Sequence, residues 1–87
     1  MTYRVIWVAG LLDRLAEFSI AADPADRDRL AVGVERFNDR LAADPLSVGE
    51  SRRGSHRVAF PPLLHVYFRV DQTGRVVWIT RVNRYGS

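Results

Sequence analysis

The spacing of apolar residues changes along this chain from a helical period to a strand period. Two segments of the first half carry apolar residues at i, i+4, i+7 and i+11: Leu11, Leu15, Phe18 and Ala22, and then Leu30, Val34, Phe37 and Leu41. This spacing places each set on one face of a helix. Asp23 and Pro24 stand between the two segments. They predict a new helix start there, because aspartate caps exposed amide groups and proline fits a first helical turn. Asp44-Pro45 predicts the end of the second helix.

Four other segments are rich in β-branched and aromatic residues and are predicted to form strands. They are residues 3–8, 56–60, 63–71 and 75–83, and a polar loop is expected over residues 46–55. Pro61-Pro62 and the turn sequence of residues 71–74 separate the last three strands. Alternation directs Leu64, Val66, Phe68 and Val70 to one side of the third strand, with His65, Tyr67 and Arg69 opposite. In the last strand, strict alternation groups Val76, Trp78, Thr80 and Val82 against Val77, Ile79, Arg81 and Asn83.

The predicted order of elements is therefore β-α-α-β-β-β, which is typical of an α+β fold. We expect a single domain over residues 1–87, in which an antiparallel sheet packs one face on a two-helix hairpin. The other face is expected to display Arg57, His65, Tyr67, Arg69 and Arg81.

Charge is distributed unevenly between the two halves of the chain. Residues 51–87 hold seven of the thirteen arginines but only one carboxylate, Asp71, whereas residues 1–50 hold six arginines and nine carboxylates. Lysine is absent. A cationic half of this kind is expected to face a polyanion, with part of the charge available to an acidic protein partner.

Several other kinds of site are not expected from these residues. The chain has no cysteine, and its two histidines, His56 and His65, are predicted on different strands, so no metal site and no cofactor are expected. The longest apolar run, residues 5–12, is far shorter than the ~20 residues that span a bilayer. We therefore expect a soluble cytoplasmic protein that has no membrane partner.

Five short stretches, taken in order, resemble the RelE/ParE family of toxins from type II toxin–antitoxin systems. They are Tyr-Arg-Val-Ile-Trp at residues 3–7, Arg-Leu-Ala-Ala-Asp-Pro at 40–45, Gly-Glu-Ser-Arg-Arg-Gly at 49–54, Val-Tyr-Phe-Arg-Val-Asp at 66–71, and a last strand ending Val-Asn-Arg-Tyr at 82–85. The resemblance covers nearly the whole chain. It implies one of two activities, since RelE-like members cut messenger RNA on the ribosome without a metal, and ParE-like members poison DNA gyrase. Both kinds are silenced by a protein antitoxin.

The RelE-like reaction drives a ribose 2′-hydroxyl onto the adjacent phosphate, which requires a base, an acid and cations around the phosphate. The resemblance and this chemistry select a catalytic set of Arg57, His65, Arg81 and Tyr85, a nucleic-acid-binding set of Arg52, Arg53, Arg69 and Arg84, and Glu50 as a possible base. His65 stands where RelE-like nucleases commonly have an arginine, and it can act as base or acid near neutral pH. Tyr85 can stack on a base. Solvated arginines and a surface histidine are the structural alternatives.

Two departures from the family pattern keep other functions open: the histidine at position 65, described above, and the residues that follow Tyr85. Many RelE-like nucleases bear a catalytic Tyr or His in a further helix or tail; here Gly86-Ser87 follow Tyr85, so Tyr85 is expected to serve. A ParE-like gyrase inhibitor and a toxin-fold protein without activity remain the alternatives. In each active case we expect an antitoxin, whose acidic amphipathic segment fits an apolar groove between the helix hairpin and the sheet edge.

Overall fold

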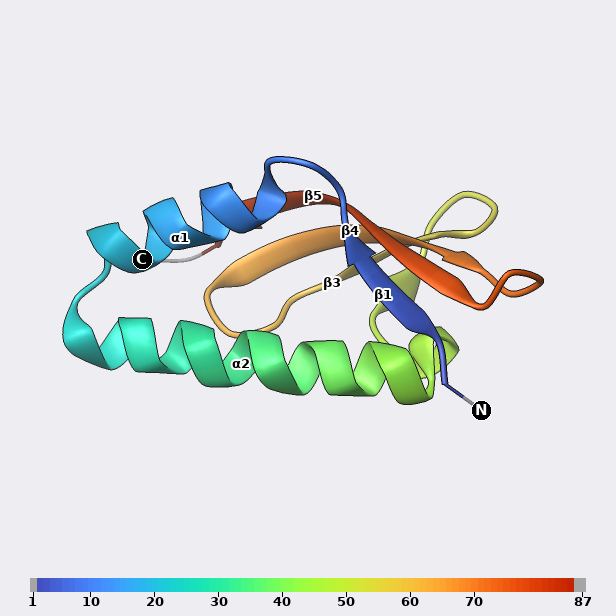
Figure 1. The fold of residues 1–87 in the computed structure, drawn as a ribbon, viewed down its shortest axis with the longest axis horizontal. Helices are drawn as coiled ribbons and strands as arrows, with labels where there is room; N and C mark the ends of the chain where they lie inside the picture. The colour runs from blue at the N-terminus through green and yellow to red at the C-terminus, as the bar shows by residue number, and fades with distance from the viewer. Residues whose placement is uncertain (1, 86–87) are drawn as a thin grey trace.

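The computed structural model describes residues 2–85, which form helices and strands in nearly the predicted order (Figure 1). The elements are β1 (Arg4–Trp7), α1 (Leu11–Ala21), α2 (Pro24–Ala43), the 3-10 turn η1 (Pro45–Ser47), β2 (Glu50–Ser51), β3 (His56–Ala59), β4 (Leu64–Asp71) and β5 (Val76–Arg84). The strands form one sheet in the order β1-β5-β4-β3-β2. The α+β class and the packing on a helical hairpin are thereby confirmed.

Two details of the sheet differ from the expectation. The first strand joins β5 in parallel, so that the sheet is mixed and only its other pairs are antiparallel. The predicted polar loop of residues 46–55 also contains η1 and the two-residue strand β2, which pairs with β3. Neither element has an apolar pattern of its own, and for this reason the spacing of apolar residues did not predict them.

Helix α2 begins and ends where Asp23-Pro24 and Asp44-Pro45 predict. The Asp23 side chain accepts a hydrogen bond from the Asp26 amide at 2.8 Å, and Pro24 occupies the first turn. The buried positions of α2 are Leu30, Gly33, Phe37 and Leu41, while no residue of α1 is fully buried. The second helix therefore carries the core, and the first lies at its margin.

The core lies between α2 and one face of the sheet (Figure 1). On the sheet side it consists of Ala59, Leu64, Val66, Phe68, Val70, Val77, Ile79 and Val82. The ring of Phe37 meets that of Phe68 edge to face, with centroids 6.0 Å apart. Burial of each large apolar side chain stabilises the fold by about 1.5–3 kcal/mol. A polar contact joins the same layers, because Trp7 Nε1 donates to Asn38 Oδ1 at 3.0 Å.

A β-bulge in β5 changes which side chains face the core. Phe68 pairs with Ile79 but Tyr67 pairs with Arg81, so Thr80 is an extra residue. Strict alternation through β5 was therefore wrong: Arg81 and Val82 lie on the faces expected for them, but before the bulge Val77 and Ile79 are in the core and Trp78 lies on the opposite face, the reverse of the expectation. The hydroxyl of Thr80 donates to the Tyr67 carbonyl oxygen at 3.3 Å, inside the bulge.

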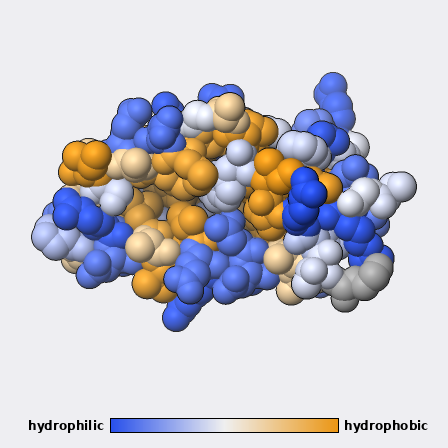
Figure 2. Space-filling view, viewed as in Figure 1, coloured by the Kyte–Doolittle hydropathy of each residue, from blue (hydrophilic) through white to orange (hydrophobic). Residues whose placement is uncertain are grey.

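Helix α1 covers the part of β5 that β1 does not reach. Pairing with β1 stops at Ile79, and beyond it Arg14 of α1 donates from Nε to the Val82 carbonyl oxygen at 2.8 Å. A second bond joins Arg14 Nη2 to Asn83 Oδ1 at 3.2 Å. Between the two helices, apolar side chains form a band at the surface (Figure 2), around a shallow hollow lined by Leu15, Ala16, Ser19, Leu30, Ala31 and Val34.

Two glycines with positive φ give a matched test of this backbone. Gly49 has φ +68° and Gly54 has φ +62°. A Cβ on Gly49 would overlap the Val58 carbonyl oxygen, whereas a Cβ on Gly54 would meet open space. We predict that Gly54→Ala lowers the free energy of unfolding by about 1–2 kcal/mol, the cost of the left-handed conformation. Gly49→Ala is expected to cost more than about 4 kcal/mol, because the clash adds to it.

Urea unfolding followed by circular dichroism measures both variants. Equal losses for the two glycines would contradict the close approach of η1 and β2 to β3.

Candidate functional site

The face of the sheet turned away from α2, called here the open face, carries polar and aromatic side chains in rows across the strands. Residues that pair directly across strands share a face. One row runs Glu50–Val58–Tyr67–Arg81 from β2 to β5, a second runs His56–Arg69–Trp78–Ile6 from β3 to β1, and a third holds His65 and Asn83. The open face thus carries the residues that alternation in β4 predicted, namely His65, Tyr67 and Arg69.

Four rings gather at one end of the open face and are called here the aromatic cluster: Phe60, His65, Tyr67 and Tyr85. The His65 ring stacks on Phe60, with centroids 4.5 Å apart and an interplanar angle of 15°. Tyr67 lies on another side of His65 at 4.5 Å, and Tyr85 lies 4.9 Å from Phe60 and 6.4 Å from His65. Phe60 and Tyr85 are half exposed, at 51% and 57%. The imidazole is therefore held among rings that solvent, or a ligand, can reach.

Two arginines of the open face lie over aromatic rings. The Arg81 guanidinium lies 5.5 Å from the centre of the Tyr67 ring, and that of Arg69 lies 6.0 Å from Trp78. A cation over a ring face is attracted by the ring's electron density, typically by about 0.5–1 kcal/mol at exposed sites. This contact places Arg81 next to the aromatic cluster. Of the predicted catalytic set, His65, Arg81 and Tyr85 therefore share one region of the open face.

Arg57, the remaining member of that set, lies on the other face of the sheet. It pairs with Phe68, whose side chain is in the core, so its own side chain is on the helix side. There its Nε donates to the Val48 carbonyl oxygen at 3.0 Å, and its Nη2 donates to that of Gly49 at 3.2 Å. The expected display of Arg57 beside His65 was therefore wrong.

The error came from the choice of which β3 residue fills the core. Alternation correctly opposes Val58 to Arg57, but Val58 lies on the open face, and Ala59 takes the core position beside Val66. Val58 is nevertheless only 1% exposed, because it lies between β2 and β4 within the row that contains Glu50 and Tyr67.

The predicted nucleic-acid-binding arginines are divided between the two faces. Arg84 pairs with Leu64 and is on the helix side, where its Nη2 lies 3.8 Å from Asp26 Oδ2. Arg52 and Arg53 are exposed in the connection between β2 and β3, and Arg69 is on the open face. Arg52 Nη1 lies 3.1 Å from Glu50 Oε2. This exposed ion pair contributes at most about 1 kcal/mol, so a phosphate can compete for Arg52.

Glu50, the possible base, is separated from the aromatic cluster. It stands two strands from Tyr67 in the same row, which is a backbone separation of roughly 10 Å. Its exposed carboxylate is paired with Arg52 instead. Sequence reasoning assigned no role to Phe60, although this aromatic residue precedes Pro61-Pro62 and shares the alternation of Val58. That pattern is the signal that would have placed it beside His65.

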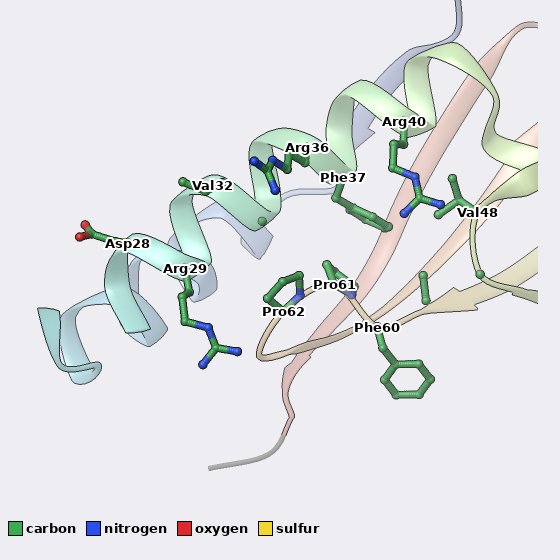
Figure 3. Close-up of a pocket in the computed structure, with 13 residues that line it drawn as sticks. Asp28, Arg29, Val32, Arg36, Phe37, Arg40, Val48, Phe60, Pro61 and Pro62 are labelled. Atoms are coloured by element: carbon green, nitrogen blue, oxygen red, sulfur yellow. The ribbon is translucent and has the colours of Figure 1, made fainter. Parts of the chain in front are cut away.

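An apolar groove of about 630 Å³ lies between α2 and the end of β3, behind the aromatic cluster (Figure 3). Val32, Phe37, Pro61 and Pro62 contribute much of its lining, and three arginines of α2 border it: Arg29, Arg36 and Arg40. Its one carboxylate is Asp28. A groove between the helix hairpin and the sheet edge, flanked by positive charge, is thus present as the sequence predicts.

Within residues 2–85 no group of three or more histidine, aspartate and glutamate side chains is arranged to hold a metal ion. In the same range, no helix has the length and apolar character needed to cross a membrane.

Comparison with known proteins gives a likeness to solved structures. No model of a known protein family matches the chain, and no curated protein matches it. Among solved structures, it is similar to a chain in the crystal structure of the toxin–antitoxin complex RelBE2 from Mycobacterium tuberculosis. The two share 25% identity with a TM-score of 0.72, and the match covers 98% of this chain and 100% of that one. The likeness therefore includes both helices and the whole sheet.

The position of Arg57 predicts a structural effect of its removal. Hydrogen bonds from a charged donor contribute about 1.5–3 kcal/mol when buried, and those of Arg57 are partly exposed. We expect Arg57→Ala to lower the free energy of unfolding by about 1–2 kcal/mol, whereas Arg53→Ala changes it by less than about 0.5 kcal/mol. Thermal and urea unfolding of the two variants measure this. An Arg57→Ala protein as stable as the parent would contradict this structural role and leave Arg57 available to bind phosphate.

Proposed function

We propose that this chain, which has the fold of a RelE-family toxin, is the toxin of a toxin–antitoxin pair and cuts messenger RNA held on the ribosome. The fold likeness over 98% of the chain supports the first part. The second part rests on one observation: His65, Tyr85 and Arg81 share the open face with half-exposed rings, in the half of the chain that carries seven arginines and one carboxylate.

The proposed reaction uses each of these side chains in a separate role. The neutral His65 imidazole takes the proton of a ribose 2′-hydroxyl, whose oxygen then forms a bond to the adjacent phosphorus. Arg81 binds the phosphate oxygens as negative charge builds up on them. The bond from phosphorus to the 5′-oxygen breaks, and the Tyr85 hydroxyl donates its proton to that oxygen. The Tyr85 phenolate regains a proton from the His65 imidazolium, which leaves a 2′,3′-cyclic phosphate and a 5′-hydroxyl.

The shape of the open face favours an RNA substrate that is held in place by another macromolecule. His65, Arg81 and Tyr85 line neither the groove beside α2 nor the hollow between the helices. Groups that lie outside both hollows receive no positioning from the walls of either one, although positioning accounts for a large part of a rate enhancement. The ribosome would provide it, with Arg52, Arg53 and Arg69 contacting phosphates around the site.

The antitoxin is the second proposed partner, and its segment would dock in the groove beside α2. The three bordering arginines favour an acidic segment, and the apolar lining favours one with an apolar face. A segment with both properties is disordered alone and folds when it binds.

One observation counts against the nuclease and keeps gyrase inhibition as a second candidate function. Arg57 and Arg84, both expected to contact phosphate, are on the helix side, where they are bonded to main-chain oxygens and to Asp26 respectively. The open face therefore has fewer free cations than the family resemblance implies for a nuclease.

Expression in bacteria without antitoxin tests the choice between these functions. We expect growth arrest with fragmented messages and no DNA-damage response. His65→Ala and Arg81→Ala should each abolish the arrest in soluble, folded protein, since each removes one proposed chemical role. His56→Ala and Arg4→Ala are matched controls on the open face, outside the aromatic cluster, and should leave the arrest intact. Arrest with a damage response would assign gyrase as the target, and no arrest from folded protein would contradict both functions.

Charge reversal in the groove tests the antitoxin proposal. The double variant Arg36→Glu, Arg40→Glu should weaken binding of the antitoxin by at least about tenfold, or 1.4 kcal/mol, because it opposes acidic residues with like charge. Calorimetric titration measures the affinity. Arg4→Glu, which changes charge on β1 only, is the control. Equal affinities for all three proteins would place the antitoxin elsewhere.

A further inference from the structure

The connection between β3 and β4, residues 60–63, belongs to both the groove and the aromatic cluster. Phe60, Pro61 and Pro62 all line the groove. Figure 3 shows the two proline rings on the side of α2, whereas the Phe60 ring points away from the helix. On that other side the ring stacks on His65 and contacts Tyr85. One short segment therefore has the groove on one side and the proposed catalytic groups on the other.

The same connection is restrained along its length. Proline fixes its own φ and restricts the residue before it, so Phe60 and Pro61 have little backbone freedom. The Leu64 amide donates to the Pro61 carbonyl oxygen at 3.0 Å, closing a turn in which Leu63 has a positive φ of 68°. A displacement at either proline is therefore transmitted to Phe60 instead of being absorbed between them.

The connection of residues 60–63 contacts α2 through Pro62 and Tyr85 through Leu63. At the helix end Pro62 packs on α2, where a Cβ built on Gly33 would lie 3.1 Å from Pro62 Cδ. At the other end the Tyr85 amide donates to the Leu63 carbonyl oxygen at 2.9 Å. Tyr85 is thus attached to the connection by its backbone as well as by its contact with the Phe60 ring.

We propose that Phe60 is a positioning residue for His65 and Tyr85, and that an acidic amphipathic segment bound in the groove acts on these two residues through it. The inference rests on the proposed function, and it adds a route by which the antitoxin reaches the site without covering it. The segment enters between α2 and the proline pair and separates them. Phe60 then moves relative to His65, and the imidazole loses the orientation that its stacking provides.

The two histidines of the chain make this movement measurable, because the imidazole Cε1 proton is expected to give one NMR signal for each of them. His65 reports on the aromatic cluster, and His56, in the row of Arg69 and Trp78, is the internal reference. Gly33→Ala is the first probe, since its methyl group presses on Pro62 from the helix side while alanine favours the helix. We expect the His65 signal to shift several times more than that of His56.

Three further variants separate transmission through Phe60 from a general change in the fold. Ala31→Gly alters one methyl group of α2 on the side of α1 and should leave His65 unshifted. In the Phe60→Leu background, Gly33→Ala should no longer shift His65, because the stacked ring is absent. Phe60→Tyr restores the ring and should restore the response. A Gly33→Ala protein that is folded but has an unshifted His65 overturns the proposal, as does an equal shift in the Phe60→Leu background.

A synthetic 16-residue amphipathic peptide of leucine, alanine and glutamate tests the occupant. We expect it to shift His65 but not His56, and to lose binding to the Arg36→Glu, Arg40→Glu variant. The same peptide with lysine in place of glutamate is the control and should not bind. Absence of binding overturns the proposed occupant, and binding in the groove that leaves His65 unshifted overturns the coupling. Neither readout requires toxicity or RNA cleavage, so a failure here is distinct from a failure of the proposed function.

Discussion

The contact between α2 and β4 is the interaction on which the rest of the structure depends. Phe37 meets Phe68 at the centre of the core, and Leu30 and Leu41 extend the contact toward either end of the helix. Since β4 presents Leu64, Val66, Phe68 and Val70 to the helix, its remaining side chains have to face outward. The position of His65 and Tyr67 on the open face is thus a geometrical result of core packing, and the proposed site needs no separate scaffold.

The parts of the fold that follow from apolar spacing were predictable from the sequence. The face of α2 is one such part, with Asp23 as its cap, and the alternation of β4 is another. What escaped prediction is set by contacts between distant segments. The bulge at Thr80 arises from pairing with β4, the pairing of β1 beside β5 is a property of the assembled sheet, and β2 forms only against β3. Local propensity carries none of that information.

The candidate site shows the same division. His65, Arg69 and Arg81 were expected on the displayed face and lie there, whereas Arg57 was expected there and does not. In β3 the adjacent residues Val58 and Ala59 are both apolar and both buried, so the pattern of apolar residues does not say which of the two faces the helix. Phe60 was not singled out, because its ring contacts are with His65 of β4 and with Tyr85, which follows β5, and these contacts form only in the assembled sheet.

The extra residue in β5 has a consequence for how sequences related to this one can vary. Thr80 contributes a single hydroxyl contact, so many side chains would suit its position. The extra residue is also not needed to keep its neighbours on their faces, because Ile79 and Arg81 already pair with the consecutive residues Phe68 and Tyr67. Loss of Thr80 would therefore convert the bulge into a regular ladder with Arg81 still on the open face and Val82 still in the core, whereas pairing of Thr80 with Tyr67 would exchange Arg81 and Val82 between the two faces. At this position, we expect related sequences to differ both in the side chain and in whether the extra residue is present.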